Sequence, residues 1–370
     1  MFSVTCEQRA LYEKVQLVSR GVSGRSTQPI QNNILLQASG EGLALIATDL
    51  EFIGMKTTMP VQAVEDGAIT VPARIFTEVA GSLPPGEVTM TADDANSLVI
   101  SGGQSKFSIR GLPADDFEQL PELDDPATFT MSQAELLKVL QRTVFATSSD
   151  ETRPILTGAL LKISGNKLET VATDTYRLAL QESRLAAEVE RDQEAIVSRR
   201  ALIELHRILD EDAEEEAQIR ISQNQVEFIV DDTVIGSRLI EGQFVNYPKV
   251  IPTGGDKKIS VDSGDFESAL RRALVVARQD AYRVVLRAAD GSMTISAQSQ
   301  DVGRAEETLN VSIEGGDAEI AFNAQFLLDM LEASETEQIV MELSGPLNSG
   351  LLRPAGDEDY LYVLMPMQIM

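Results

Sequence analysis

A pattern that occurs three times organises this chain of 370 residues. The opening stretch FSVTCEQRALYEKVQLVSR matches FTMSQAELLKVLQRTVFAT, which begins at Phe129, and ISVDSGDFESALRRALVVA, which begins at Ile259. Each copy predicts a short strand that leads into an amphipathic helix. In the second copy Leu136, Leu140 and Val144 recur on one helical face, so that face is predicted to be buried. The repetition predicts three domains of similar fold.

A second marker keeps the same order and spacing. It reads ITVPARIFTEVAGSLP from Ile69, AIVSRRALIELHRIL from Ala195 and EIAFNAQFLLDMLEAS from Glu319. Each copy predicts a strand followed by a helix, and Pro72 suits a helix start. Between the two helices of each copy, the sequence predicts paired strands with Gly-containing turns, such as ILLQASGEGLALIATD. We predict an α+β fold with domains at residues 1–125, 126–252 and 253–370.

Residue usage narrows the class of protein. The only cysteine is Cys6 and the only histidine is His206, so no intrachain disulfide can form and a catalytic thiol would depend on that one histidine. Neither the spacing of a zinc protease nor that of a calcium loop is present, which leaves magnesium bound by carboxylates as the only metal alternative, and we expect no metal and no cofactor. The sequence has no apolar run of about 18 residues and no signal-peptide pattern, so we expect a cytoplasmic protein without a membrane partner.

The net charge of the chain bears on whether it binds nucleic acid. With 58 Asp and Glu against 31 Lys and Arg, the formal net charge is −27, which by simple counting disfavours a nucleic-acid partner. That conclusion holds only if the basic residues are evenly spread. The acidic run DEDAEEE, from Asp210 to Glu216, predicts a solvated helix end or loop rather than a metal site.

Asp49 and Asp174 end equivalent strands in two copies, each within the letters ATD. A catalytic pair of carboxylates would have to lie within about 10 Å of each other, which residues in different domains are not expected to do. An Asp that closes a turn by hydrogen bonding explains the repetition better. A carboxylate-dependent enzyme on a three-domain scaffold is therefore the alternative hypothesis, and we predict no catalytic residues because no pocket of convergent polar groups can be assembled.

Several motifs occur in the order found in a known family. VPAR at Val71, TVATDTYRLAL at Thr170, FNAQFLLDML at Phe322 and the C-terminal YLYVLMPMQIM resemble the bacterial DNA polymerase III beta subunits, the replicative sliding clamps. The resemblance extends from residue 2 to the last residue. It implies a non-enzymatic processivity factor of the DNA-clamp fold: a head-to-tail homodimer of six domains, with sheets outside and helices around a hole that encircles duplex DNA.

In such a ring the acidic residues can face outward while basic residues face the hole. The resemblance implies weak contact with DNA that is not sequence-specific, because a clamp must slide. We expect the DNA-facing residues to be Arg20, Arg25, Lys138, Arg142, Arg199, Arg200, Arg207, Arg271 and Arg272. The helix NAQFLLDMLEAS of the third copy has no basic residue, so this lining cannot be uniform.

The resemblance also implies complementary edges in the first and third domains that pair between subunits. Phe107 and Ile109 alternate with Lys106 along the first edge, so they are expected to share one face. Unpaired strands of this kind would be prone to aggregation, and pairing them in a dimer removes the hazard. The expected interface residues are Lys106, Phe107, Ile109, Val275, Val276, Glu306 and Glu307.

Finally, the resemblance implies a cleft between the second and third domains that binds short peptide motifs of partner proteins. The expected partners are the DNA polymerase III catalytic subunit, the clamp loader, other DNA polymerases, ligase and mismatch-repair proteins. Thr175, Tyr176, Val245 and Lys249 depart from a common family pattern at the cleft entrance. The expected cleft residues are Leu156, Thr173, Thr175, Tyr176, Arg177, Leu178, Val245, Lys249, Val250, Asn323, Phe326, Leu347, Ser349, Val363, Leu364, Met365, Pro366 and Met367.

Overall fold

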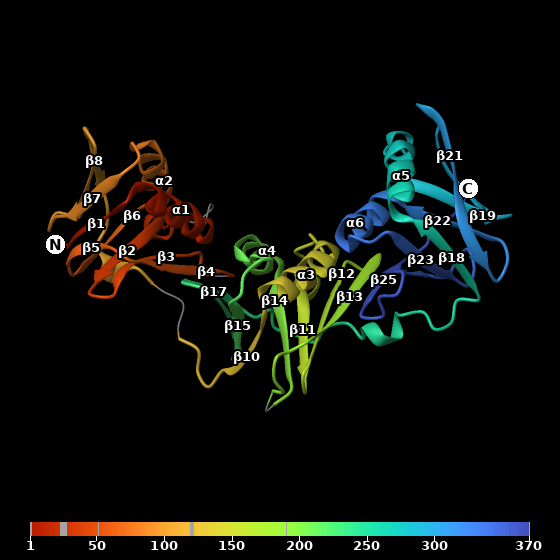
Figure 1. Cartoon of the computed structure of the whole chain (residues 1–370), viewed down its shortest axis with the longest axis horizontal. Coiled ribbons are helices and arrows are strands. Elements are labelled where there is room, and N and C mark those ends of the chain that lie inside the picture. The colour runs from red at the N-terminus through yellow and green to blue at the C-terminus, as the bar shows by residue number, and fades with distance from the viewer. Residues whose placement is uncertain (1, 23–27, 51, 119–121, 190, 370) are drawn as a thin grey trace. The chain divides into compact units, whose positions relative to one another are not determined.

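The computed structural model describes residues 2–22, 28–50, 52–118, 122–189 and 191–369, which form two compact units (Figure 1). Unit 1 consists of residues 1–136 and 200–239, and unit 2 consists of residues 137–199 and 240–370. The second repeat therefore contributes to both units. Its helices α3 (Gln133–Thr143) and α4 (Arg199–Ile208) each include a point at which the chain passes from one unit to the other.

Unit 1 contains two antiparallel sheets, with strand orders β5-β1-β7-β8-β9 and β10-β15-β16-β17-β4-β3-β2-β6. Helices α1 and α2 lie side by side next to them (Figure 1). The elements are β1 (Phe2–Glu7), α1 (Gln8–Val18), β2 (Asn33–Ser39), β3 (Gly42–Thr48), β4 (Gly54–Met59), β5 (Gln62–Glu65), β6 (Gly67–Pro72), α2 (Ala73–Ser82), β7 (Glu87–Ala92), β8 (Ser97–Gly102), β9 (Ser105–Arg110), β10 (Ala127–Ser132), β15 (Glu216–Ile221), β16 (Gln225–Val230) and β17 (Thr233–Arg238).

Unit 2 contains one 12-stranded antiparallel sheet, in the order β14-β11-β12-β13-β25-β24-β23-β18-β21-β20-β19-β22. Its elements are β11 (Gly158–Ser164), β12 (Lys167–Thr173), β13 (Arg177–Arg184), β14 (Gln193–Ser198), β18 (Lys257–Asp262), α5 (Ser263–Ala277), β19 (Arg283–Ala289), β20 (Ser292–Ser299), β21 (Gly303–Glu314), β22 (Ala318–Asn323), α6 (Ala324–Ser334), β23 (Gln338–Leu343), β24 (Gly350–Pro354) and β25 (Tyr360–Leu364). Short 3-10 helices are η1 (Ser19–Gly21), η2 (Pro29–Asn32), η3 (Ala114–Asp116), η4 (Val144–Ala146), η5 (Pro154–Thr157) and η6 (Tyr247–Lys249).

The predicted helices form where apolar residues recur on one face. Leu136, Leu140 and Val144 are all buried, which confirms the stripe predicted for the second copy. Pro72 occupies the N-cap position of α2, again as predicted. The acidic run lies between α4 and β15, and residues 210–212 and 214–216 are exposed, as expected for a solvated segment.

Backbone register confirms that the repeats are equivalent. One cross-strand pair recurs at the same place in each copy, as Leu35 with Ile46, Leu160 with Val171, and Val285 with Ser296. After the last strand of each copy, one backbone N–H donates to an equivalent carbonyl of an edge strand. These bonds run from Leu112 to Thr70 at 2.9 Å, from Ile240 to Ile196 at 2.8 Å and from Met367 to Ala321 at 2.7 Å.

Sheets continue from one repeat into the next. In unit 1, β17 of the second repeat pairs with β4 of the first, with Ile235 opposite Met55. In unit 2, β13 of the second repeat pairs with β25 of the third, with Leu178 opposite Val363. Repeats are therefore joined by backbone ladders as well as by connecting segments.

The strand-end aspartates close turns, as predicted. One Asp49 oxygen accepts the N–H groups of Phe52 and Ile53 at 2.8 and 2.9 Å. Asp174 accepts those of Tyr176 and Arg177 at 2.9 and 3.0 Å. Because the carboxylates satisfy backbone donors, their repetition is explained by folding.

Candidate functional site

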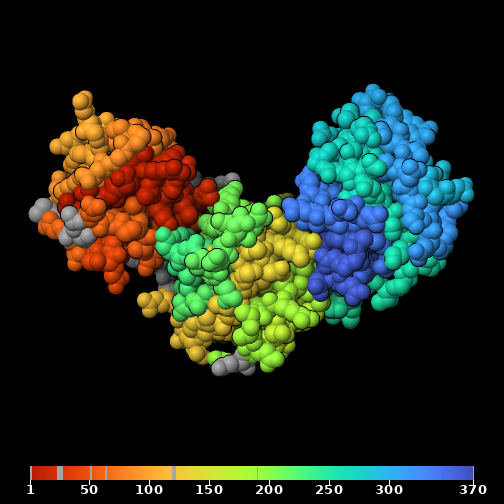
Figure 2. All heavy atoms as spheres, viewed as in Figure 1, coloured from red at the N-terminus to blue at the C-terminus, as the bar shows by residue number. Residues whose placement is uncertain are grey.

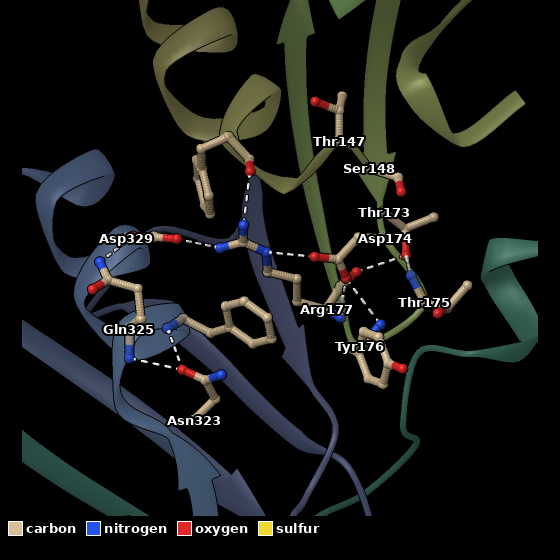
Figure 3. Close-up of polar contacts among 12 residues, drawn as sticks. Thr147, Ser148, Thr173, Asp174, Thr175, Tyr176, Arg177, Asn323, Gln325 and Asp329 are labelled. Carbon is tan, nitrogen blue, oxygen red and sulfur yellow. Dashed lines mark hydrogen bonds and ion pairs between the residues drawn. The ribbon is translucent and has the colours of Figure 1, made fainter. Parts of the chain in front are cut away.

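The turn between β12 and β13 is held by a network of polar contacts (Figure 3). Thr173 Oγ1 accepts the N–H of Thr175 at 3.1 Å and donates to the carbonyl of Arg177 at 2.6 Å. The carbonyl of Tyr176 accepts the N–H of Met365 at 2.9 Å. The turn of the second repeat is thus tied to the C-terminal segment of the third.

Arg177 is the first residue of β13, directly after this turn, and its side chain is only 10% exposed. Its Nε contacts Asp174 at 3.0 Å, Nη1 pairs with Asp329 of α6, and Nη2 donates to the carbonyl of Phe145 at 2.9 Å. The guanidinium also stacks 4.2 Å from the ring centre of Phe326. Every nitrogen of Arg177 therefore has a partner within unit 2 (Figure 3).

The predicted cleft residues separate into a buried and an exposed group. Leu156, Leu178, Val363 and Leu364 are at most 4% exposed, so they belong to the core rather than to an open groove. Leu178 and Val363 lie in a cluster against which Phe244 and Ile251 of the connecting segment pack. A peptide could reach these side chains only if their covering neighbours moved.

The exposed group includes several large apolar side chains. Tyr176 is 61% exposed, Met365 46%, Val250 47% and Leu347 76%. Thr175, Val245 and Lys249 are also exposed, while Arg177, Asn323, Phe326, Ser349, Pro366 and Met367 are half-buried. Thr173 is buried. The structure joins Tyr176 to Met365 and Arg177 to Phe326, and cleft membership of Val245, Lys249, Leu347 and Ser349 stays a prediction.

The C-terminal residues reach this region along β25. Figure 2 shows them, in dark blue, packed against the yellow and green surface of the second repeat in unit 2. Tyr247 of η6 is buried beside them, and its hydroxyl donates to Glu169. Burial is the larger cause that raises the pKa of Tyr247, and the contact with Glu169 raises it further. Tyr247 and Asp329 were not among the residues predicted from the sequence. Asp329 is the only acid within the apolar stretch NAQFLLDML, a signal that could have identified it.

Thr175 has a left-handed backbone, with φ at 81°. A β-branched residue is strained there, at a cost of about 1–2 kcal/mol relative to glycine. We expect Thr175→Gly to raise the free energy of unfolding by about 1 kcal/mol, because relief of strain exceeds the added entropy of the unfolded chain. Chemical denaturation measures this. Thr175→Ala keeps the Cβ atom and should give no gain, and an equal gain from both variants would show that the backbone is not the cause.

Most of the predicted DNA-facing arginines contact acids of their own chain. Arg271 pairs with Glu267 at 2.7 Å and Glu332 at 2.6 Å. Arg200 pairs with Asp49, whose side chain is 4% exposed, and donates to the carbonyls of Arg20 and Val22. Arg200 therefore joins the first and second repeats within unit 1, so reversing its charge would disturb the fold.

Glu204 of α4 is the acid shared by two other predicted DNA contacts. Its side chain is 10% exposed, with Arg20 at 3.8 Å and Arg207 in a closer ion pair. Lys138 and Arg199 are half-buried, and Arg25 lies outside the described residues. The charges of Arg20 and Arg207 are thus partly neutralised before any phosphate approaches.

Arg142 is buried within unit 2 rather than exposed on a surface, contrary to the expectation for a DNA-facing residue. It is 8% exposed and is bonded to Asp357 at 2.7 Å and to Gln181 at 3.0 Å. Burial by itself would raise the pKa of Asp357, but the hydrogen bond and the charge of Arg142 hold that pKa below its ordinary value. The prediction failed because helical spacing shows which residues of α3 share a face. It does not show which side chains of other elements pack against that face.

One of the predicted interface residues needs a correction. Ile109 is 6% exposed and packs in the core of the first repeat, so its side chain is covered by its own repeat rather than offered to a second subunit. Glu307, predicted at the interface, forms an ion pair at 2.7 Å with Arg272, predicted to face DNA, and both assignments stay predictions. Phe107 is 36% exposed and Val275 70%, Lys106 and Glu306 are exposed, and Val276 is half-buried.

The thiol of Cys6 is not prepared for catalysis. It is buried in β1, and burial followed by the charge of Glu7 raises its pKa to about 11, so it is protonated near neutral pH. Among the described residues, no group of three or more His, Cys, Asp or Glu side chains is arranged to hold a metal ion. Within the same residues, no helix is both long and apolar enough to cross a bilayer.

Comparison with known proteins agrees with this architecture. Family models of the DNA polymerase III beta subunit match residues 2–121 (N-terminal domain), 130–248 (central domain) and 248–368 (C-terminal domain). Beta sliding clamps of Pseudomonas putida KT2440 and Escherichia coli K12 are 34% and 32% identical, each over 99% of both chains. A sliding clamp of Pseudomonas aeruginosa bound to griselimycin superposes with a TM-score of 0.95 at 33% identity, covering 100% of both chains.

Three equivalent domains of helices packed on antiparallel strands, joined through continuous sheets, define the class of DNA-clamp folds. Within that class, the chain belongs to the DNA polymerase III beta subunit family, the sliding clamps of bacterial replication. The resemblance noted in the sequence is confirmed. The relatives give no support to the alternative of a carboxylate-dependent enzyme.

Proposed function

We propose that this sliding clamp acts as a head-to-tail homodimer that encircles duplex DNA in the cytoplasm. Free sheet edges support the dimer. Among the described strands, β9 pairs only with β8, and residues 303–310 of β21 pair only with β20. Each edge can accept a strand of a second subunit, and two such contacts related by a two-fold axis close a ring. The single cysteine suits a reducing compartment.

Tyr176 and Met365, which are exposed and joined by a backbone hydrogen bond, are the observation that best supports partner binding. Large exposed apolar side chains mark interaction sites in proteins. We propose that this region binds short peptides with one Gln and two or three large apolar residues, and that the DNA polymerase III catalytic subunit, clamp loader, other polymerases, ligase and mismatch-repair proteins present such motifs. Methionine side chains suit a surface that accepts several sequences.

Contact with DNA is proposed to be weak, and the ion pairs of the predicted DNA-facing arginines support this. Each arginine already paired with an acid contributes less to phosphate binding, because phosphate must compete with a carboxylate. Few phosphates are then neutralised, so affinity for DNA should fall only slowly with salt, at a slope of roughly −0.9 for each phosphate contacted. Retention must come from encirclement.

Retention on circular DNA tests the function as a whole. Protein loaded by a clamp loader onto nicked circular DNA should remain bound at high salt, and it should be lost within minutes once the DNA is cut at one site. Gel filtration of the DNA with labelled protein measures both. Equal retention on circular and linear DNA would contradict encirclement, and loss from the circle at high salt would indicate ordinary electrostatic binding.

A further inference from the structure

Two arginines of the second repeat, each with a side chain 10% exposed, reach α6 of the third repeat from different places. Arg177 of β13 pairs with Asp329 in the middle of the helix and stacks on Phe326. Arg142 of α3 donates from Nη2 to the carbonyl of Ser334, the last residue of the helix, at 3.2 Å. Both contacts lie entirely within unit 2.

The contact at Ser334 is favourable for a specific reason. The last carbonyls of a helix lack partners within it, and the helix dipole places partial negative charge there. Ser334 is 1% exposed, so water cannot readily satisfy its carbonyl. The guanidinium of Arg142 supplies both the donor and the positive charge. Removing it would leave a buried acceptor unpaired, which costs more than the bond contributes.

Arg142 is itself held from several directions. Nη1 contacts Gln181 of β13 and Asp357 of the segment between β24 and β25, and the guanidinium lies 5.1 Å from the ring centre of Tyr360. Gln181 and Tyr360 are opposite each other in the ladder that joins the two repeats. Arg142 therefore connects α3, the joined sheet and the end of α6 through one rigid, planar group.

The other end of α6 carries predicted cleft residues. Asn323 is its N-cap, and its side chain accepts the N–H groups of Gln325 and Phe326 at 2.9 and 3.3 Å. Phe326 is half-buried beside Arg177. A helix moves largely as a rigid body, and the 11 residues of α6 span about 16 Å. A displacement at Ser334 would therefore be transmitted to Asn323 and Phe326.

We propose that Arg142 is a positioning residue of the peptide cleft: together with Arg177 it fixes α6 against the second repeat, and this sets where Asn323 and Phe326 meet a bound peptide. The inference rests on the proposed peptide-binding function. Arg142 does not contact the peptide and acts through α6.

Arg142→Met tests this, because methionine fills similar space without charge or donors. Peptide affinity is measured by fluorescence titration under conditions in which the variant is fully folded, and we expect it to fall about threefold to tenfold. Hydrogen exchange should accelerate at the amides of α6 while those of α5 keep their rates. Asp357→Asn, which leaves Arg142 and its bond to Ser334 in place, should show smaller changes of the same kind.

Arg220→Met is the matched control. Arg220 is half-buried and pairs with Glu227 at 2.9 Å, but it lies in unit 1. Arg220→Met should change neither peptide affinity nor hydrogen exchange in α6. Unchanged exchange in α6 of Arg142→Met, or unchanged affinity despite faster exchange, would overturn the positioning role. If the unaltered protein bound no peptide, the proposed peptide-binding function would fail, and the exchange rates would still decide whether Arg142 fixes α6.

Discussion

Phe107→Asp should convert the protein from a dimer to a monomer at micromolar concentration. Phe107 is 36% exposed on β9, the edge strand of its sheet, and in the proposed ring it meets Val275 of a second subunit. An unpaired carboxylate in that apolar contact costs about 3–5 kcal/mol. The dissociation constant should rise by about a hundredfold or more. Sedimentation or light scattering distinguishes 40.2 kDa from twice that mass.

Phe52→Asp provides the control for this experiment. Phe52 is 47% exposed and lies in the turn between β3 and β4, which belong to a different sheet from β9. The Phe52→Asp variant should remain dimeric. An undiminished dimer in Phe107→Asp would remove Phe107 from the interface, and dissociation of both variants would mean that added charge, rather than its place, weakens the ring.

Deletion of residues 365–370 should reduce peptide affinity more than any single substitution proposed here. It removes Met365 together with the Met367 N–H that bonds to the carbonyl of Ala321 at 2.7 Å. Two buried apolar anchors contribute roughly 3–6 kcal/mol before ordering costs, which suggests micromolar binding to the intact protein. Loss of such anchors should weaken binding by at least about tenfold. Met365→Ala should have a smaller effect.

A shorter deletion separates the possible causes. Removing residues 368–370 eliminates the carbonyl of Gln368, which accepts from Arg283 at 3.2 Å, but keeps Met365 and Met367. The variant that lacks residues 368–370 should retain most of its affinity for a fluorescent peptide. Dimer mass is measured in parallel. Equal affinity in the intact protein, Met365→Ala and both deletions would mean that the C-terminal segment is structural only.

Local features of the fold could be predicted because they depend on nearby residues. The helical stripe of Leu136 and Leu140 follows from spacing, and the turn-closing role of Asp174 follows from its place after a strand. The pairing of β13 with β25 could not be predicted from pattern, since no short turn joins these strands and fixes their register.

The same limit explains the errors at individual residues. Arg142 and Asp357 are 215 positions apart, so nothing near Arg142 in the sequence indicates that an acid lies opposite it. Ile109 alternates with exposed residues on an edge strand, and alternation alone does not show which face is covered by the rest of its domain. Thr175 could have been recognised as strained only from its backbone angle.

The ladders between repeats have a consequence for dissecting this protein. A fragment cut at the end of the first repeat would lose β17 and expose the backbone of β4, and a fragment lacking the third repeat would expose β13. Open strands of this kind recruit other strands and promote aggregation. The repeats are therefore not independent modules, and an isolated repeat would need a capping strand or charged edge substitutions to remain monodisperse.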